Sequence, residues 1–200
     1  MARVTTMASR LVRRTAIAAG IAVVAGLGLG FAAGKPVDPK DILPARHLPA
    51  DLCDRIGDVS SLLPKASNGK TPELVKTGST AIRCSVKADE TAQTTYSSAT
   101  LDITVTPYAG KDGGAGNPPL KPAQVARQVF ERRAMTADPE RSNVKRVTRA
   151  ATGGQSWTVT LVELHADLIV QVDYTAQPIE RQAAESAALA MADRAIWEAK

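Results

Sequence analysis

A short motif near the carboxyl end of the chain holds residue types that could do chemistry. Glu163, His165 and Asp167 alternate in a Glu-x-His-x-Asp stretch. Two carboxylates and an imidazole at this spacing can bind a metal ion or pass a proton, because histidine titrates near neutral pH. The same stretch also fits a polar turn between two buried strands, since turns collect such residues. Only the first interpretation would make the protein an enzyme.

The rest of the sequence shows none of the patterns that mark common catalytic or cofactor sites. No serine stands in a Gly-x-Ser-x-Gly turn, and no histidine pair has the spacing of metal ligands on a helix. Gly113 and Gly114 are not followed by the Gly-Lys-Ser/Thr ending of a phosphate-binding loop. We therefore expect a protein that is not an enzyme and that holds no cofactor and no metal.

Cys53 and Cys84 are the two cysteines of the chain. In an oxidising compartment two cysteines most simply form one disulfide, which here would join an early helix to the first strand. The alternative is a reactive free thiol, which needs a nearby histidine or another group that lowers its pKa. The sequence indicates no such neighbour, and we predict the disulfide.

Positive charge is concentrated in one stretch of the chain. Residues 121–149 hold eight Lys and Arg against three acids, whereas residues 150–200 hold three against seven. The candidate basic patch comprises Arg127, Arg132, Arg133, Lys145, Arg146 and Arg149. It could face anionic lipid headgroups, an acidic envelope polymer or a partner protein, or be neutralised by the acidic C-terminal helix. Nucleic acid is not an expected partner, because Phe130 alone interrupts these charges where interleaved aromatics would be needed.

The first 34 residues predict the topology of the chain. They hold four arginines and no acid, and so supply most of the formal net charge of +5. Thr15–Gly34 then carries no charge, and as a helix it would be about 30 Å long, enough to cross a bilayer core. We expect a cytoplasmic tail at 1–14, a transmembrane signal anchor at 15–34, and the remainder outside the cell membrane. A cleavable signal peptide ending near Gly34 is the alternative, and the protein would then be secreted.

The elements that must position these residues follow from hydrophobic patterning. Residues 35–50 hold four prolines and predict an extended linker, so that the folded domain covers 51–200. Alternation of apolar and polar side chains predicts five strands, at 80–87, 94–107, 143–150, 156–164 and 168–175.

Helices are expected before, between and after these strands, at 51–56, 58–63, 122–135 and 179–198. The last helix is rich in alanine, with Leu189, Ile196 and Trp197 as its larger anchors. The order α-β-β-α-β-β-β-α predicts an α+β fold with a mainly antiparallel sheet of about five strands. The helices are expected on one face of that sheet.

Three short segments lie in the first part of the predicted domain: Asp51-Leu52-Cys53, Ser61-Leu62-Leu63-Pro64 and Ile82-Arg83-Cys84-Ser85. Together they resemble a family of uncharacterised actinobacterial cell-envelope proteins, many of them lipoproteins. The resemblance covers about residues 51–107 and the closing helix in outline. It implies an α+β envelope domain with one disulfide, carried by Cys53 and Cys84. This chain lacks a cysteine after its hydrophobic segment, so anchoring would depend on residues 15–34 instead of a lipid.

These features predict a membrane-anchored, extracytoplasmic domain that binds an envelope protein or an anionic polymer, without enzymatic activity. An extracellular sensing domain is the second interpretation, with a small or lipidic molecule held between sheet and helix. An envelope enzyme that uses the 163–167 turn is the third.

Overall fold

The computed structural model of the chain describes residues 38–59, 74–77, 81–88, 98–114, 117–151 and 155–200. The chain divides into two compact units. The first comprises residues 1–42 and 112–119, and its described part contains a short 3-10 helix, η1, Pro39–Asp41. The second comprises residues 43–111 and 120–200 and carries the sheet. Residues 43–50 of the expected linker therefore belong to the folded unit.

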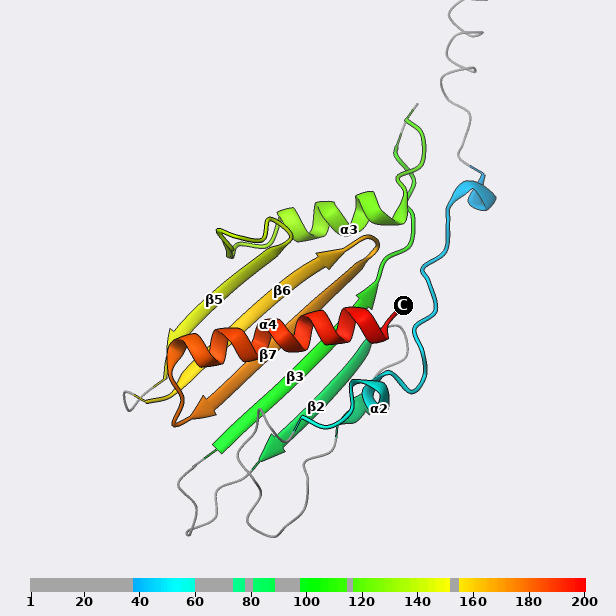
Figure 1. Cartoon of the computed structure of the whole chain (residues 1–200). Coiled ribbons are helices and arrows are strands. Elements are labelled where there is room, and N and C mark those ends of the chain that lie inside the picture. Colours follow the sequence, from blue (N-terminus) through cyan, green and yellow to red (C-terminus); the bar gives the residue numbers. More distant parts are fainter. Residues whose placement is uncertain (1–37, 60–73, 78–80, 89–97, 115–116, 152–154) are drawn as a thin grey trace, which may run out of the picture. The chain divides into compact units, whose positions relative to one another are not determined.

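Seven antiparallel strands form one sheet in the order β1-β2-β3-β7-β6-β5-β4 within the described residues (Figure 1). The strands are β1 Val75–Thr77, β2 Ile82–Ala88, β3 Ser98–Pro107, β4 Thr136–Ala137, β5 Val144–Ala150, β6 Trp157–His165 and β7 Leu168–Gln177. β3 pairs along its whole length with β7, which places Leu101 opposite Tyr174. The α+β class and the antiparallel sheet are thus confirmed.

The expectation of about five strands was too low, because the sheet has a further strand at each edge. β1 is three residues long and β4 two, and both are exposed. A strand needs several alternating residues before its period can be recognised, so neither gave a signal. The five predicted strands are β2, β3, β5, β6 and β7, with residues 94–97 of the second lying outside the described ranges.

One face of the sheet, the α4 face, is covered by two helices: α2, Leu52–Ile56, and α4, Arg181–Glu198 (Figure 1). The buried residues of α4 recur at helical spacing and are mostly alanines: Ala184, Ala187, Ala188, Met191, Ala192, Ala195 and Ile196. Small side chains let the helix lie close to the sheet. They pack on inward-facing residues such as Leu161, Val172 and Cys84, which form the main core with α2.

The third helix, α3, Pro122–Glu131, lies on the opposite face, so the expectation that all helices share one face was wrong. Its buried Ala126 and Phe130 pack against Val162 of β6 and Ile169 of β7. These two strand residues point away from the main core because side chains alternate along a strand. Val162 follows Leu161, and Ile169 follows Leu168, and both leucines face the main core. Consecutive apolar residues of this kind indicate a strand that is covered on both faces. We call this side the α3 face.

The limits of two predicted helices differ from the structure. α3 ends at Glu131 instead of residue 135, and α4 begins at Arg181 instead of 179. The helix predicted at 58–63 lies largely outside the described residues. So do the tail at 1–14 and the span at 15–34, and within the described part no helix is both long enough and apolar enough to cross a bilayer.

Trp197 was predicted to anchor α4, and this was wrong, since its side chain is 70% exposed. It follows Ile196, which is buried in the stripe that faces the sheet. One residue of an α-helix turns the side chain by about 100°, which carries Trp197 out of that stripe. Lys200 instead lies over its ring, with Nζ 5.1 Å from the centroid.

Candidate functional site

The hairpin between β6 and β7 carries Glu163, His165 and Asp167, with a tight turn at residues 166–167 as predicted. Ala166 adopts a φ of 52°, which a non-glycine residue tolerates in such a turn. Glu163 points into the α4 face and is 2% exposed, which is exceptional for a carboxylate. The first acid of the Glu-x-His-x-Asp stretch is therefore part of the interior.

Glu163 is held by two neighbours from the loop before β5. Arg141 donates from Nη2 to Glu163 Oε1 over 2.7 Å, and Asn143 Nδ2 donates to the same oxygen over 3.1 Å. Glu163 Oε2 is buried and has no hydrogen-bond partner within the described residues. Burial raises the pKa of Glu163, and the positive charge of Arg141 opposes that rise. These bonds give the carboxylate a structural role in joining β6 to the loop.

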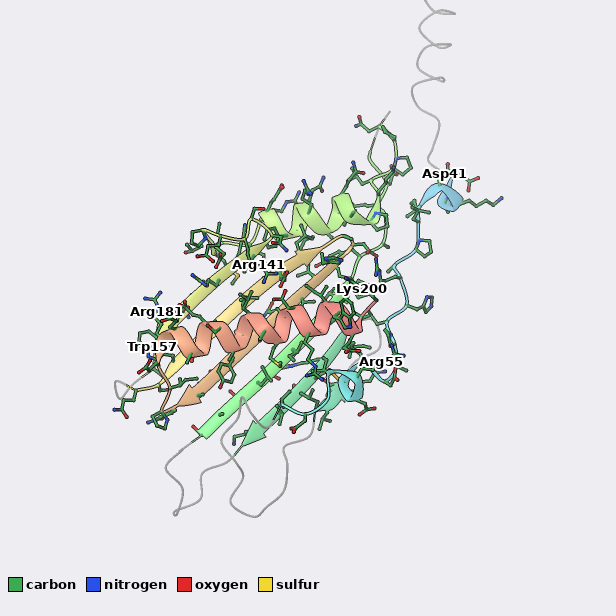
Figure 2. All side chains as sticks on the ribbon, viewed as in Figure 1. Asp41, Arg55, Arg141, Trp157, Arg181 and Lys200 are labelled. Atoms are coloured by element: carbon green, nitrogen blue, oxygen red, sulfur yellow. A yellow bond between two sulfur atoms is a disulfide. The ribbon has the colours of Figure 1, made fainter. Side chains whose placement is uncertain are left out.

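Arg141 also reaches α4, where Nη1 and Nη2 bond Asp193 over 2.8 and 2.7 Å. The guanidinium thereby connects a strand, a loop and a helix (Figure 2). The sequence reasoning missed Arg141 and Asp193, because both lie far from Glu163 along the chain. The signal that could have indicated a partner was Glu163 itself, an acid between the apolar Val162 and Leu164.

Asp167 contacts a different partner from Glu163. Its carboxylate pairs with Arg46, whose Nε donates to Oδ2 over 2.9 Å. No hydrogen bond or ion pair joins Glu163, His165 and Asp167 to one another in the described structure. The described residues also contain no group of three or more His, Cys, Asp or Glu side chains placed to hold a metal ion.

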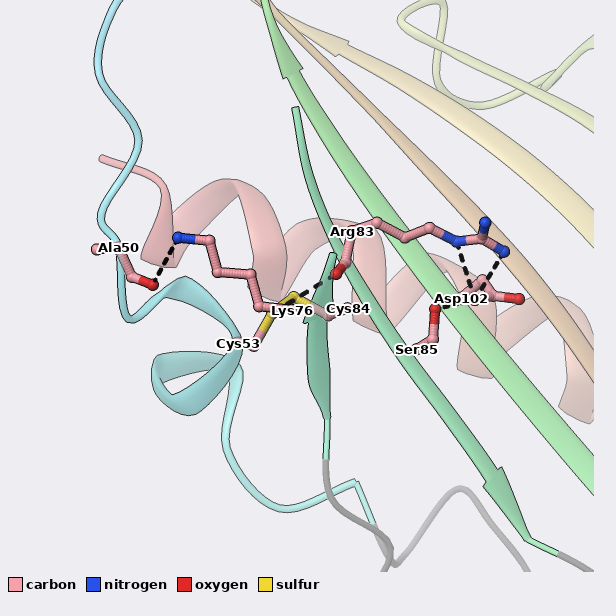
Figure 3. The surroundings of a disulfide bond; sticks show 7 residues. All are labelled: Ala50, Cys53, Lys76, Arg83, Cys84, Ser85 and Asp102. Carbon is pink, nitrogen blue, oxygen red and sulfur yellow. Dashed lines mark hydrogen bonds and ion pairs between the residues drawn. A yellow bond between two sulfur atoms is a disulfide. The ribbon is translucent and has the colours of Figure 1, made fainter. Parts of the chain in front are cut away.

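The predicted disulfide is present in the structure and joins Cys53 to Cys84 (Figure 3). The two Cα atoms are 5.6 Å apart, and the bond links α2 to β2 within the main core. Lys76 of β1 supports the same corner by donating from Nζ to the Ala50 carbonyl over 3.2 Å. Neither cysteine is left as a free thiol.

The predicted basic patch is divided between the two faces of the sheet, so its treatment as one surface was wrong. Arg146 points to the α4 face, where Nη1 lies 2.8 Å from Asp138 and 3.7 Å from Glu185 of α4. For this residue the alternative holds, that acids of the C-terminal helix neutralise the charge. Alternation along β5 is the reason, because Lys145 and Arg149 must then point to the other face.

The remaining cations define what we call the α3 basic surface: Arg127, Arg132, Arg133, Lys145 and Arg149. Lys145 Nζ donates to the carbonyls of Glu131 and Arg133, 2.9 and 3.0 Å away, and lies 5.0 Å from the Phe130 ring centroid. Arg133 donates from Nη1 to the side-chain amide oxygen of Gln171, 3.4 Å away. None of the five pairs with a carboxylate within the described residues.

This lack of acidic partners distinguishes the α3 basic surface from the other arginines. Six described arginines pair with carboxylates: Arg46, Arg55, Arg83, Arg141, Arg146 and Arg181. Arg181 also lies over the Trp157 ring, 5.8 Å from its centroid, at one end of α4 (Figure 2). Of the described arginines without a carboxylate, all but Arg194 belong to the α3 basic surface.

A pocket of about 240 Å³ lies beside this surface, between the turn after α3 and the sheet. It is lined by Ala134, Met135, Val147, Arg149, Thr158 and Thr160. The Thr160 hydroxyl donates to Asp173 over 2.7 Å, and the hydroxyls of Thr158 and Thr175 are 3.0 Å apart. Sequence reasoning singled out Arg149 but not the rest, since the lining comes from three separate segments.

Comparison of this chain with protein-family models, with curated proteins and with solved structures found no match.

Proposed function

We propose that this chain is a membrane-anchored, extracytoplasmic binding domain of the cell envelope that binds an anionic envelope polymer without enzymatic activity. In this proposal residues 15–34 form the anchor, and the α3 basic surface is the binding face. The resemblance to actinobacterial envelope proteins is part of the same proposal, and that family supplies no activity to transfer.

The observation that carries the binding function is the difference between paired and unpaired arginines. Structural arginines of this domain meet carboxylates, and three of them (Arg141, Arg146 and Arg181) are tied to acids of α4. Four cations beside α3 and on β5 share one face and lack such partners: Arg127, Arg132, Arg133 and Arg149. A cluster of cations that lack carboxylate partners attracts polyanions at a distance.

The proposed location is supported by two independent features. Both cysteines form one disulfide, a bond that persists in oxidising compartments and is rare in the cytosol. The N-terminal arginines precede an uncharged stretch, which orients a signal anchor with its N-terminus in the cytoplasm.

The binding function is tested with the full chain in nanodiscs of zwitterionic lipid and with poly-L-glutamate as the probe. We expect binding that weakens as salt is added, because exposed charges are screened. The double variant Arg132→Gln/Arg133→Gln should bind several-fold more weakly, whereas the control Arg55→Gln/Arg194→Gln, which removes the same charge elsewhere, should bind normally. Equal loss in both variants would contradict the proposal. Tighter binding to phosphatidylglycerol vesicles than to polyglutamate would overturn the choice of a polymer.

The location is tested in cells that express the full chain. In the variant Trp197→Cys, which places a thiol at a position whose native side chain is 70% exposed, a membrane-impermeant thiol reagent added to intact cells should label residue 197. Failure to label would contradict an external domain. The N-terminus of the mature protein should still include residues 1–34, and a start near Lys35 would replace the anchor by a cleaved signal peptide.

An extracellular sensing domain is the second candidate function, and the pocket beside Arg149 is the observation that favours it. Pockets that bind small molecules combine apolar walls with a few polar groups, and this one has both.

A further inference from the structure

We propose that the pocket beside Arg149 binds a small molecule that has one anionic head, a carboxylate or a phosphate, and a short alkyl arm. The proposal rests on the sensing function above and does not require polymer binding. It gives that function a ligand class, which the arrangement of the pocket lining defines.

The polar end of the pocket is formed by Arg149 and Thr158, which stand opposite each other on β5 and β6. Arg149 has no carboxylate partner within the described residues, and its guanidinium can donate two parallel bonds to a carboxylate or phosphate. In the pair of hydroxyls from Thr158 and Thr175 one donates to the other, so one hydroxyl hydrogen remains to be donated elsewhere. This end therefore offers donors to an anion.

The apolar end lies one step along the same strands. Val147 stands opposite Thr160, two residues from Arg149, which is about 7 Å along a strand. Met135 precedes Thr136, which pairs with Arg146, so Met135 lies next to the Val147 level of β5. An arm that leaves the Arg149 end would contact Val147, Met135 and Ala134.

The charged residue of the pocket lining is a cation, Arg149, so the lining favours an anion over a cation. Asp173 beneath Thr160 already accepts from the Thr160 hydroxyl and from the Gln171 amide, both over 2.7 Å. Arg133 faces Gln171 from the other side. The pocket volume of about 240 Å³ is below the usual range for drug-sized ligands, so the arm must be short.

The chain provides its own probes for the test, because its four methionines include one in the pocket. Met135 lines the pocket, whereas Met191 belongs to α4 and is buried in the main core. We would label the methionine methyl groups with ¹³C in the full chain in nanodiscs and titrate sodium hexanoate. The Met135 signal should shift and saturate while the Met191 signal stays in place.

Variants and matched ligands decide whether the site works as proposed. Arg149→Gln should weaken the hexanoate titration about tenfold or more, as the loss of a charge-assisted bond predicts, and Arg194→Gln, which removes an exposed charge outside both the pocket lining and the α3 basic surface, should leave it unchanged. Hexylamine should cause no saturating shift at Met135. Comparison with hexyl phosphate identifies which anionic head the pocket prefers.

Three results would overturn the proposal: no saturating shift of Met135 with either anion, an equal response to hexylamine, or unchanged affinity in Arg149→Gln. Polyglutamate binding is measured separately, and it depends on Arg132 and Arg133, which do not line the pocket. Failure of both hexanoate and hexyl phosphate with intact polyglutamate binding would therefore reject the pocket proposal alone. Loss of polyglutamate binding with an intact Met135 titration would reject the polymer proposal alone.

Discussion

Arg141 donates to Glu163 over 2.7 Å and is the only cation in contact with that buried carboxylate within the described structure. The pair lies where the loop before β5, strand β6 and helix α4 meet. A buried carboxylate is tolerated when a charged partner and hydrogen bonds compensate for its lost hydration. The Oε1 atom of Glu163 accepts bonds from Arg141 and Asn143, whereas its Oε2 atom has no hydrogen-bond partner within the described residues.

The first prediction concerns removal of that partner. Arg141→Met should lower the free energy of unfolding by about 3 kcal/mol. This value is at the lower end of the range for breaking a buried ion pair, because the Arg141 side chain is itself partly exposed. The double variant Arg141→Met/Glu163→Leu should recover most of the loss, since no uncompensated charge remains. Urea unfolding of both variants gives the values. Arg55→Gln breaks an exposed pair and serves as the control without measurable change. A double variant no more stable than Arg141→Met would refute this account.

The second prediction is the pH dependence that Glu163 confers. Its pKa is raised in the folded protein above its ordinary value of 4.5, so the folded state holds the proton more tightly than the unfolded state. Its contribution to stability is fully present below pH 4.5 and is lost as pH rises through the raised pKa. The stability of the wild type relative to Glu163→Gln should therefore fall above pH 4.5. A rise over the same interval would show that the pKa is lowered instead. Glu185 has the opposite effect, because its pKa is lowered in the folded protein. Its contribution to stability is present above pH 4.5 and is lost as pH falls through the lowered pKa.

The third prediction concerns the disulfide. The bond closes a loop with a sequence separation of 31 residues. Cys53→Ala/Cys84→Ala should lower the free energy of unfolding by about 3–4 kcal/mol, because the unfolded chain regains its loop entropy. In the wild-type protein, a thiol reagent should find no free cysteine in denaturant until a reductant is added. Stoichiometric labelling before reduction would contradict the bond.

The fourth prediction concerns Lys145, which caps the end of α3. Lys145→Met keeps most of the contact with Phe130 but leaves the carbonyls of Glu131 and Arg133 without their ammonium donor. We expect a loss of about 1 kcal/mol, because a cation at a helix C-terminus is stabilising. Hydrogen exchange should quicken in the last turn of α3 and stay unchanged in α4. Arg127→Gln, on the same helix, is the matched control, and equal quickening there would argue against the cap.

The strands could be predicted because each has enough alternating residues to show its period. Ile82, Cys84 and Val86 all point into the core, as do Leu168, Val170, Val172 and Tyr174. The disulfide could be predicted because the chain offers only one pairing. These inferences depend on local spacing or on counting, and neither requires knowledge of which elements meet.

The site could be predicted only in part, because its residues meet through the tertiary structure. Arg141 and Asp193 converge on Glu163 from a loop and from the last helix, and Met135 joins Arg149 from the turn after α3. The faces of a strand can be read from alternation, but the helix that covers each face cannot. That is why the basic residues on β5 were grouped when the structure separates Arg146 from Lys145.

The pairing of β3 with β7 has a consequence for how the chain reaches its fold. These strands are the middle of the sheet, yet β7 is made long after β3, and Leu101 can meet Tyr174 only when nearly the whole chain is present. Before that moment β2–β3 and β5–β6 are separate ribbons, and isolated two-stranded ribbons are only marginally stable in water. Closing so long a loop late makes folding slow and cooperative. A chain synthesised from its N-terminus would therefore lack its complete core until β7 and α4 are both present.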